Sequence, residues 1–484
     1  MSTSTGPIAA ANPYRGKSII VTGGGRSGAS AAAVLQRLGA SVRIVDRDPA
    51  VLTTSLSELG VEYAGDLSEL PADVDLVVTS PGWPPQQPLL ADAAGKGVPV
   101  VGEVEIAWTL RDPGIPWLAV TGTNGKTTTV GMLTSILKAA GDQVAEVGNV
   151  GPPVVAAVVD RAAGYDVFAV ELSSFQLHWA PSVRPAAGAL LNLAADHLDW
   201  HGSAAAYAAD KARIFNPQGI NVFNADDDGV VEQISALPPT ARTVGFTLGV
   251  PKVGQVGIEG DELVDRSYLA EGGSEVLAAV AEVSPPGLHN VANALAGAAL
   301  ARSLGVGAAD VRKGLLRYQP GAHRNVQVAS TEYAGHAIDF VNDSKATNMH
   351  AAAASLVAYD NVVWIAGGLL KGATPDDVRP LIEQALPNLR GVVLIGRDRG
   401  VIADALRRHA PDIPQVEVET TDDRAMRTAV DLAHRLACET VSRMDAAATV
   451  LLAPAAASMD MFVDYAQRGD RFAAAARQIA ESTP

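Results

Sequence analysis

The stretch Trp117–Thr129 constrains the fold of this 484-residue chain more than any other. A short apolar run, Trp117–Val120, predicts a buried strand, and a glycine-rich turn follows it at Gly122–Gly125. Lys126 and Thr127 then open a helical pattern of apolar residues. A strand, a glycine loop and a helix N-terminus are typical of phosphate binding, because backbone N–H groups and the helix dipole attract phosphate oxygens. Lys126 would reach the β- and γ-phosphates of a nucleotide, and the Thr127 hydroxyl would bind Mg²⁺.

One position departs from the common form of this motif, which has a glycine five residues before the Gly-Lys pair. That position is Val120 here, and the chain has Gly122 instead. A plain glycine turn is therefore the alternative interpretation. The apolar strand before the loop and the helix after it favour nucleotide phosphate.

Composition restricts the class of protein. With 48% hydrophobic and 19% charged residues the chain is globular, and its length predicts several domains. The formal net charge of −16 argues against a nucleic-acid partner. A single cysteine, Cys438, excludes an internal disulfide and fits a reducing compartment. No apolar run approaches the ~18 residues of a membrane span, and no secretory signal is apparent after Met1. We expect a cytoplasmic monomer with residues 1–14 as a loose tail.

The chain begins with a second glycine loop. A predicted strand at Lys17–Thr22 runs into Gly23–Gly28, which matches G-x-G-x-x-G, and a helix is expected over Ala29–Leu38. The next strand, Val42–Val45, ends at Asp46. This β-α-β unit with its acid is the dinucleotide fingerprint, which taken alone suggests NAD and is a weak signal.

Further polar residues follow predicted strands, at the edge where parallel sheets bind ligands. Ser80 and Gly82 follow a strand over residues 75–79, and Asn149 lies in a loop after another strand. Glu171 ends the strand Asp166–Glu171, where an acid would reach Mg²⁺; an exposed or helix-capping acid is the alternative.

A cluster of two acids and two histidines follows the strand Ala189–Leu191. Its members are Asp196, His197, Asp199 and His201. Such a cluster suits a metal and phosphates, with surface turn chemistry as the alternative.

Three other features belong to this middle part of the chain. Lys211 lies on a predicted helix, where a lysine is normally a solvated charge. Asn290 and Asn293 lie one turn apart on a helix, which indicates a hydrogen-bonding role or simple capping. Residues 250–285 alternate glycines, acids and short β-branched runs, which predicts a β-hairpin excursion.

The last part of the chain predicts a third parallel α/β layer. Three apolar strands, Val362–Ala366, Gly391–Gly396 and Thr449–Ala453, each end in Gly, Pro or polar residues. Linkers rich in Pro and Gly at residues 112–116 and 317–321 divide the chain. The predicted fold is α/β with three domains at residues 1–113, 114–320 and 321–484: a Rossmann-like domain, a central P-loop ATPase-type domain and a second Rossmann-like domain.

Taken together, these motifs resemble the Mur ligases, ATP-dependent enzymes that add amino acids to the UDP-linked peptidoglycan precursor. The resemblance covers almost the whole chain, and its motifs keep their order. They are Gly122–Thr128, Glu171–Ser174, Asp196–Asp199, His289-Asn290 and His323-Arg324.

Two segments resemble the branch that adds D-glutamate. These are Glu171-Leu-Ser-Ser-Phe-Gln-Leu177 and Asn342-Asp-Ser-Lys-Ala-Thr-Asn348. The branch that adds a diamino acid carries Asp-Asn-Pro-Arg, which is absent here. Folylpolyglutamate synthases have a different, Gly-Lys-Gly-type loop and no UDP-binding domain like residues 17–110.

The resemblance implies a reaction in cytoplasmic peptidoglycan precursor synthesis in bacteria. The terminal carboxylate of UDP-N-acetylmuramoyl-L-alanine attacks the γ-phosphate of ATP, and the D-glutamate amine then attacks the acyl phosphate. It also implies two Mg²⁺ ions. Thr127 and Glu171 would hold the first, while His197 and a carbamylated Lys211 would hold the second.

The resemblance assigns further residues to each substrate. Gly122, Thr123, Asn124, Gly125, Lys126, Thr127 and Thr128 would hold the ATP phosphates, Asn290 and Asn293 the adenine, and Arg324 and Asp343 the phosphates and ribose. Lys345, Thr347, Lys371, Ser458 and Tyr465 would bind D-glutamate, and Lys126, His197, Lys211 and Lys345 form the catalytic set. Arg26, Ser27, Asp46, Arg47, Ser80, Gly82, Asn149 and His197 would hold the UDP substrate.

Three substitutions depart from the pattern of the family. Tyr465 stands where phenylalanine is expected, and Arg26 and Arg47 stand where uncharged residues are expected. The two arginines would grip the pyrophosphate and uracil edge more strongly, or merely lie in solvent.

Other interpretations remain open at this point. Another amino-acid ligase of the same family, a nucleotide-gated binding protein and an NAD dehydrogenase are the alternatives. A GTPase-like switch predicts Asn-Lys-x-Asp for base recognition, and that motif is absent.

Overall fold

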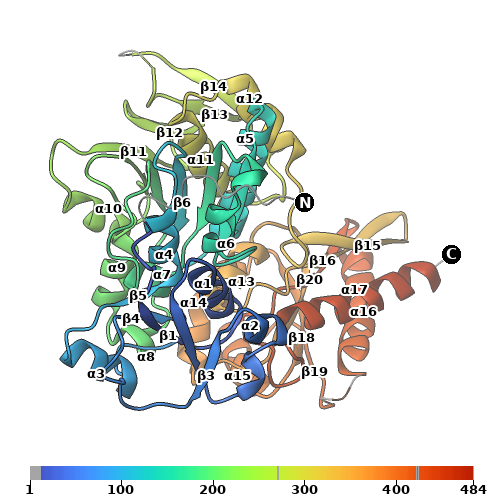
Figure 1. Cartoon of the computed structure of the whole chain (residues 1–484). Helices are drawn as coiled ribbons and strands as arrows, with labels where there is room; N and C mark the ends of the chain where they lie inside the picture. Colours follow the sequence, from blue (N-terminus) through green and yellow to red (C-terminus); the bar gives the residue numbers. More distant parts are fainter. Residues whose placement is uncertain (1–11, 270–271, 421, 423, 483–484) are drawn as a thin grey trace. The chain divides into compact units, whose positions relative to one another are not determined.

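A computed structural model describes residues 12–269, 272–420, 422 and 424–482. Residues 1–11 of the predicted tail lie outside this part of the chain. The described residues form three sheets of mainly parallel strands covered by helices, which confirms the predicted α/β class (Figure 1). None of the described helices is both long and apolar enough to cross a lipid bilayer.

The chain divides into two compact units. The first unit comprises Met1–Glu282 and Ala292–Tyr318, and the second comprises Val283–Val291 and Gln319–Pro484. The division passes through helix α11 (Leu288–Arg302). The domain limits expected near residues 113 and 320 stay predictions.

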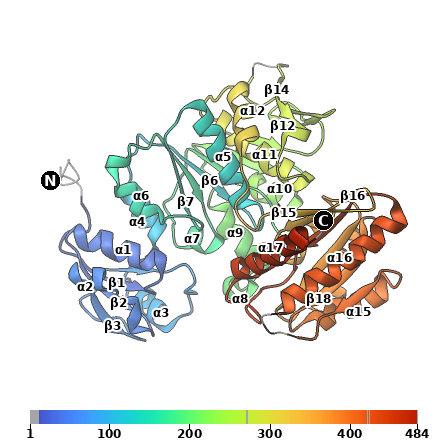
Figure 2. The same cartoon turned by 90° about the vertical axis from the view of Figure 1, so that its right-hand side faces the viewer.

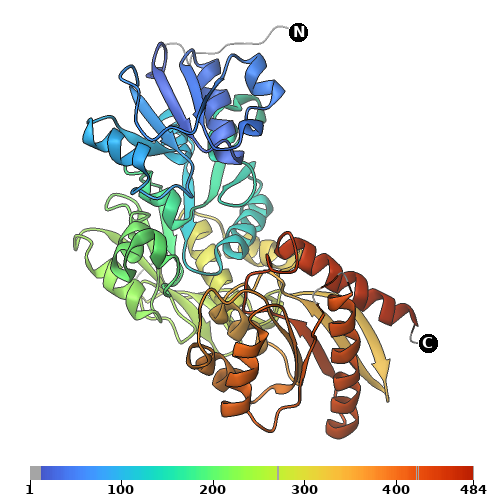
Figure 3. The ribbon, with the colours of Figure 1, turned by 90° about the horizontal axis from the view of Figure 1, so that it is seen from below.

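The first sheet, blue in Figure 3, has the parallel strand order β3-β2-β1-β4-β5. Its strands are β1 (Ser18–Thr22), β2 (Ser41–Val45), β3 (Glu62–Gly65), β4 (Leu76–Thr79) and β5 (Val100–Gly102), and its helices are α1 (Arg26–Arg37), α2 (Thr54–Glu58), α3 (Pro88–Gly95) and α4 (Glu103–Leu110).

The helix expected from about Ala29 to Leu38 is confirmed as α1, but it begins three residues earlier, at Arg26. The glycine loop is tighter than expected, because Gly25 already caps the helix and Gly28 lies in its first turn. A Cβ at Gly28 would lie 1.9 Å from the carbonyl oxygen of Gly23, so only glycine fits there.

The second sheet has nine strands in the order β14-β13-β12-β11-β10-β9-β6-β8-β7. Its strands are β6 (Trp117–Thr121), β7 (Val144–Gly148), β8 (Val167–Glu171), β9 (Ala187–Leu190), β10 (Ile220–Asn224), β11 (Arg242–Phe246), β12 (Gln255–Glu259), β13 (Glu262–Asp265) and β14 (Glu275–Ala279). The neighbouring helices are α5 (Lys126–Ala140), α6 (Val154–Val159), α7 (Ser174–His178), α8 (Leu198–His201), α9 (Ala204–Ala212), α10 (Asp228–Ser235), α11 and α12 (Ala308–Arg317).

The strands β12, β13 and β14 form an antiparallel edge on this otherwise parallel sheet. All three lie within residues 250–285, so the predicted β-hairpin excursion is confirmed. Strand β6 lies between β8 and β9, fully buried, so the loop that follows it opens at the carboxyl edge of three parallel strands.

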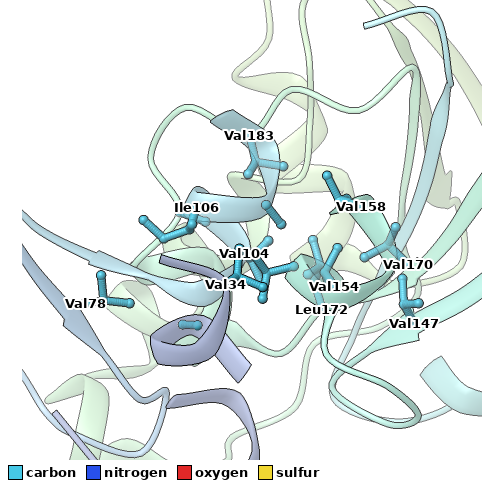
Figure 4. Packing of buried hydrophobic residues seen from close by; sticks show 14 of the residues in the cluster. Val34, Val78, Val104, Ile106, Val147, Val154, Val158, Val170, Leu172 and Val183 are labelled. Carbon is cyan, nitrogen blue, oxygen red and sulfur yellow. The ribbon is translucent and has the colours of Figure 1, made fainter. Parts of the chain in front are cut away.

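One hydrophobic core joins the first sheet to the second. Figure 4 shows Val34 of α1 and Val104 of α4 packed beside Val154 and Val158 of α6. All four side chains are buried. The glycine loop before α1 and the phosphate loop before α5 therefore belong to one continuously packed unit.

The third sheet belongs to the second unit, which is drawn in orange and red in Figure 2. Its strand order is β15-β16-β20-β17-β18-β19. Its strands are β15 (Val326–Tyr333), β16 (His336–Asn342), β17 (Val362–Gly367), β18 (Leu389–Ile395), β19 (Gln415–Glu417) and β20 (Ala448–Leu452). Its helices are α13 (Met349–Leu356), α14 (Pro375–Ala385), α15 (Arg399–His409), α16 (Ala425–Met444) and α17 (Tyr465–Ser482).

Alternation along β17 explains why helices cover both faces of this sheet. Val362, Trp364 and Ala366 pack with α13, α14 and α15, while Val363 and Ile365 pack with α16 and α17. Successive strand side chains point to opposite faces, so an apolar strand needs a cover on each. The three predicted apolar strands are confirmed as the parallel strands β17, β18 and β20.

Candidate active site

The phosphate loop joins β6 to α5 in the predicted way. Val120 lies inside the strand and is buried, so the loop itself is the shorter segment Gly122–Gly125. Gly125 caps α5 with φ +85°, and a Cβ there would lie 2.3 Å from Asn293 Oδ1. Asn293 also accepts a hydrogen bond from Thr129 Oγ1 at 3.2 Å. Glycine is therefore required at the helix start, as a backbone-lined phosphate site demands.

Two side chains that the sequence analysis did not select hold this loop in shape. Asn192 accepts from the Asn124 backbone N–H at 2.8 Å, and its own amide donates to the Asn124 carbonyl at 3.1 Å. The Tyr207 hydroxyl lies 3.0 Å from Thr123 Oγ1. Asn192 lies two residues after the end of β9, and a polar residue just past a strand end was the only available signal for it. Fixed backbone donors bind phosphate without reorganisation.

Glu171 lies next to the start of α5. The Thr127 hydroxyl donates to Glu171 Oε2 at 2.6 Å, and Asn149 Nδ2 donates to Glu171 Oε1 at 2.8 Å. The glutamate is only 2% exposed, so the alternative of an exposed acid was wrong. A buried carboxylate beside a hydroxyl at a phosphate loop supplies the hard oxygen atoms that Mg²⁺ prefers.

Lys211 is buried rather than solvated, so the surface interpretation of this lysine was wrong. Its Nζ donates to the carbonyl of Gly122 at 2.8 Å, and Lys126 Nζ donates to the same oxygen at 2.8 Å. Burial and the nearby Lys126 charge hold the pKa of Lys211 well below its usual value, although Asp196 and Glu171 oppose this shift. Because both amines lie against one carbonyl oxygen, repulsion from the positive charge of Lys126 favours the neutral form of Lys211.

The predicted acid and histidine cluster divides into two parts. His197 has φ 53°, its ring packs against Phe175 at a tilt with centroids 4.8 Å apart, and its Nε2 lies 3.5 Å from Asp196 Oδ2. The ring nitrogens of His201 instead lie 2.9 Å from Asp210 Oδ2 in α9 and 3.0 Å from Ser174 Oγ in α7. They therefore connect α8 to these two helices.

Within the described residues, no group of three or more His, Cys, Asp or Glu side chains is arranged to hold a metal. The four-residue cluster expected at Asp196, His197, Asp199 and His201 therefore does not form a metal site by itself. The set Thr127, Glu171, His197 and Lys211 contains only two side chains of those kinds, so this finding does not test it.

The first glycine loop is braced from two sides. Asp46 Oδ2 accepts from the Gly24 N–H at 2.8 Å, and the Ser80 hydroxyl donates to the Gly23 carbonyl at 2.8 Å. Strands β1, β2 and β4 thus bring Asp46 and Ser80 to the loop, as parallel strand ends should. Of the other predicted residues, Arg26 and Ser27 lie in the first turn of α1.

The remaining residues predicted for this loop are more exposed. Arg47 is exposed and lies 3.4 Å from Asp66, in an ion pair that contributes little in solvent. Gly82 is exposed in the turn after β4. Asp46 and Ser80 therefore contact the glycine loop directly, whereas the ion-pair partner of Arg47 is the surface residue Asp66.

In the second unit, Lys345 and Tyr465 meet at the carboxyl end of the third sheet. Lys345 Nζ lies 3.9 Å from the centre of the Tyr465 ring, a cation–π contact. Ser458 follows β20 and is buried, and Thr347 follows Lys345 in the loop after β16. Lys371 has φ 53°, in a turn that Asp398 holds by accepting from the Leu370 N–H at 2.8 Å.

Two further predicted nucleotide residues, Asp343 and Asn290, also belong to the second unit. Burial raises the pKa of Asp343 to about 6, although Ser355, Arg324 and the Asn325 N–H favour its charged form. Asn290, at the start of α11, donates to the Pro286 carbonyl at 3.1 Å. Asn293, one turn further along the same helix, belongs to the first unit.

Arg468 was not predicted from the sequence, and it is only 1% exposed within α17. Phe472, Ala476 and Ile479 are buried on the same helix, and their spacing continues back to position 468. A charged residue at a core position of this pattern was the signal that could have identified it.

The comparisons with known proteins agree with this geometry. Residues 17–102 match the family described as the Mur ligase MurD-like N-terminal domain, and residues 120–301 match the Mur ligase middle domain. The UDP-N-acetylmuramoylalanine--D-glutamate ligase of Streptomyces avermitilis is 51% identical over 477 residues, which cover 96% of this chain and 99% of that protein. The ligase of the same name from Thermobifida fusca is 52% identical over 475 residues, with the same coverage.

Solved structures share the fold at low identity. MurF ligase from Thermotoga maritima, in complex with ADP, matches with a TM-score of 0.56 and 16% identity over 97% of this chain and 96% of that chain. The UDP-N-acetylmuramate-alanine ligase MurC from the same organism matches with a TM-score of 0.53 and 19% identity, over 96% of this chain and 99% of that chain.

Proposed function

The chain belongs to the Mur ligase family, and from this premise we propose that it joins D-glutamate to UDP-N-acetylmuramoyl-L-alanine with the energy of ATP. One observation carries the choice within the family. Relatives named for that reaction are 51% and 52% identical over 96% of this chain. The activity is that of an ATP-dependent ligase in peptidoglycan precursor synthesis.

The reaction has two steps, and both take place at the terminal carboxyl group of the L-alanine. A carboxylate oxygen of the terminal L-alanine forms a bond to the γ-phosphorus, and the bond from that phosphorus to the ADP oxygen breaks. The D-glutamate amine then attacks the carbonyl carbon, loses a proton, and phosphate leaves from a tetrahedral intermediate. Because a free carboxylate is a poor electrophile, the enzyme has to stabilise charge on the transferring phosphoryl group.

The phosphate loop is suited to that task. Asn192 holds its backbone and Tyr207 holds the Thr123 hydroxyl, so the N–H groups of Gly122–Gly125 are fixed in advance. We assign the ATP phosphates to this loop together with Thr128. The Lys126 amine, which lies against the loop carbonyls, would turn toward the γ-phosphate.

The residues around Glu171 fit a magnesium ion. Thr127 and Glu171 offer oxygen atoms at the end of the phosphate loop, and Asn149 orients the carboxylate. We assign the first Mg²⁺ to Thr127 and Glu171, where it would neutralise charge on the phosphates. A second Mg²⁺ is assigned to His197 and the carbamate of Lys211.

Carbamylation of Lys211 has a physical basis in this chain. Only an unprotonated amine attacks CO₂, and this reaction forms an N–C bond, releases a proton and creates a carboxylate. The buried position of Lys211 and the Lys126 charge both lower the pKa of its amine. The new negative charge would also lie among Lys126 and metal ions, which favours it electrostatically.

The remaining substrates are assigned by the motifs of the family. Asn290 and Asn293 would contact the adenine, and Arg324 and Asp343 the rest of the nucleotide. D-Glutamate would lie against Lys345, Thr347, Lys371, Ser458 and Tyr465. The UDP substrate would lie against Arg26, Ser27, Asp46, Arg47, Ser80, Gly82, Asn149 and His197.

The setting follows from the substrates. ATP and a UDP-linked precursor are cytoplasmic metabolites, so the enzyme would act in the bacterial cytoplasm. We propose a monomer, because each substrate group above is assigned to residues of a single chain.

Phosphate release from ATP tests the proposal. The full chain should release phosphate only when both UDP-N-acetylmuramoyl-L-alanine and D-glutamate are present. Lys126→Ala should lose the reaction, while Lys138→Ala, an exposed lysine on the same helix, should keep it. Release that needs neither acceptor would instead indicate a nucleotide-gated binding protein.

A further inference from the structure

Arg468 is a buried cation in the last helix of the chain. It is among the largest fully buried side chains, with 1% of its surface exposed. Burial lowers the pKa of this guanidinium to about 10, which still leaves it charged at neutral pH. A charge in such a position is costly unless its hydrogen bonds are satisfied.

The guanidinium donates hydrogen bonds to two loops. Nη2 donates to the Ser344 carbonyl at 2.8 Å, Nε donates to Ser344 Oγ at 3.0 Å, and Nη1 donates to the Ala456 carbonyl at 3.0 Å. No ion pair between the described residues includes Arg468. Its hydrogen-bond acceptors are all neutral, so these bonds hold the two loops in place, while the nearby Asp460 carboxylate favours the charged form of Arg468.

The Ser344 hydroxyl extends this contact to a third segment. It donates to the carbonyl of Tyr465 at 2.7 Å while it accepts from Arg468. Tyr465 in turn holds Lys345 over its ring at 3.9 Å. One planar cation therefore ties together the loop after β16, the loop after β20 and the first turn of α17.

These three segments carry residues that we assign to D-glutamate. Lys345 follows Ser344 directly, Ser458 lies two residues after Ala456, and Tyr465 begins α17. A shift of either loop would change the spacing between Lys345 and Ser458. Binding of a small dicarboxylate depends on such spacing, because its charged ends lie a fixed distance apart.

We propose that Arg468 is a positioning residue for D-glutamate, which sets the distance between the loops of Lys345 and Ser458. This inference rests on the assignment of those two residues under the proposed function. The planar fork of arginine is needed, because three donors must reach three acceptors in fixed directions. Lysine would keep the charge and only part of the hydrogen bonding.

Steady-state kinetics of the full chain test this role. Arg468→Met should raise KM for D-glutamate about tenfold or more, since it leaves buried carbonyls without donors. KM for ATP and for UDP-N-acetylmuramoyl-L-alanine should change by less than about twofold. Arg468→Lys should recover part of the loss. Arg477→Met, an exposed arginine on the same helix, is the matched control and should behave as the unmodified chain.

A second variant covers the case in which Arg468→Met fails to fold. Ser344→Ala keeps the buried arginine but removes its link to Tyr465, and it should raise KM for D-glutamate without changing KM for ATP. Equal KM for D-glutamate in Ser344→Ala, Arg468→Lys and the unmodified chain would overturn the inference. An equal rise of all three KM values would overturn it too, because it would indicate general loosening.

Lys345→Ala separates this inference from its premise. A raised KM for D-glutamate in Lys345→Ala, together with unchanged values in the Arg468 and Ser344 variants, would contradict the positioning role alone. An unchanged KM for D-glutamate in Lys345→Ala would contradict the assignment of the D-glutamate site itself.

Discussion

The hydroxyl of Thr127 donates a hydrogen bond of 2.6 Å to the carboxylate of Glu171. Thr127 lies in the first turn of α5, and Glu171 is the last residue of β8. The two residues are far apart in sequence, and the parallel pairing of β6 with β8 brings them together. This contact unites the phosphate loop with the acid that we assign to the metal.

Glu171→Gln tests that assignment. The amide keeps the size of the side chain and can still accept from Thr127, but it loses the negative charge that attracts a cation. We expect the Mg²⁺ concentration for half-maximal activity to rise about tenfold or more, whereas the ligation rate at saturating Mg²⁺ should change less. A magnesium titration of the ligation rate measures it.

Glu146→Gln is the control for this experiment, because Glu146 is exposed on the neighbouring strand β7. It should show the magnesium dependence of the unmodified chain. If Glu171→Gln showed that same dependence, Glu171 would not hold the metal.

Lys211→Ala tests the carbamate. Loss of the side chain should lower activity strongly, and added short carboxylates such as acetate or formate should restore part of it. The physical reason is that a free carboxylate can occupy the space left by the buried side chain and supply the missing negative charge.

A control on the unmodified chain and a measurement of bound metal complete this test. Short carboxylates should not raise the activity of the unmodified chain. Absence of rescue in Lys211→Ala, with bound metal unchanged, would argue against a carbamate at this position.

Glu103→Gln tests a prediction on stability. Glu103 is buried at the start of α4, and its Oε1 accepts from the Val155 N–H of α6 at 2.5 Å. Burial raises the pKa of this carboxyl from 4.5 to about 7, although the N–H groups of Val155 and Val154 oppose the shift. The folded chain therefore keeps a proton that the unfolded chain loses.

The sign of the effect follows from this proton. Between about pH 4.5 and about pH 7 the folded state binds more protons at Glu103, so its contribution to stability falls as the pH rises. The decline is at most about 1.4 kcal/mol per pH unit. Glu103→Gln cannot ionise, so its melting temperature relative to the unmodified chain should increase across this window.

Thermal melts at several pH values measure this difference, with Glu58→Gln as a control at an exposed glutamate of α2. A melting-temperature difference between Glu103→Gln and the unmodified chain that stays constant from pH 4.5 to pH 7 would exclude the raised pKa.

Local patterns predicted much of the fold. The strand before Gly122 and the helix after Lys126 are visible in the sequence, because a buried strand leaves a continuous apolar run and a packed helix leaves apolar residues at helical spacing. The same holds for β17, β18 and β20. The start of α1 was misplaced, because glycines in a loop do not show which of them already caps the helix.

Sequence patterns predicted less of the candidate site than of the fold. Lys211 looks like a solvated residue of a helix, and only the tertiary structure shows its amine against the Gly122 carbonyl. Asn192 holds the phosphate loop from the loop after β9, and Arg468 donates hydrogen bonds to loops 12 and 124 residues away in sequence. Contacts between distant segments leave no periodic trace, so they have to be found in three dimensions.

The choice of amino acid is the central claim, and product analysis by mass spectrometry tests it most directly. The full chain would be incubated with ATP, Mg²⁺ and UDP-N-acetylmuramoyl-L-alanine, and separately with D-glutamate, L-glutamate, L-lysine or diaminopimelate. The account predicts a product only with D-glutamate, heavier than the UDP substrate by one glutamate residue. A product with L-lysine or diaminopimelate, and none with D-glutamate, would contradict it.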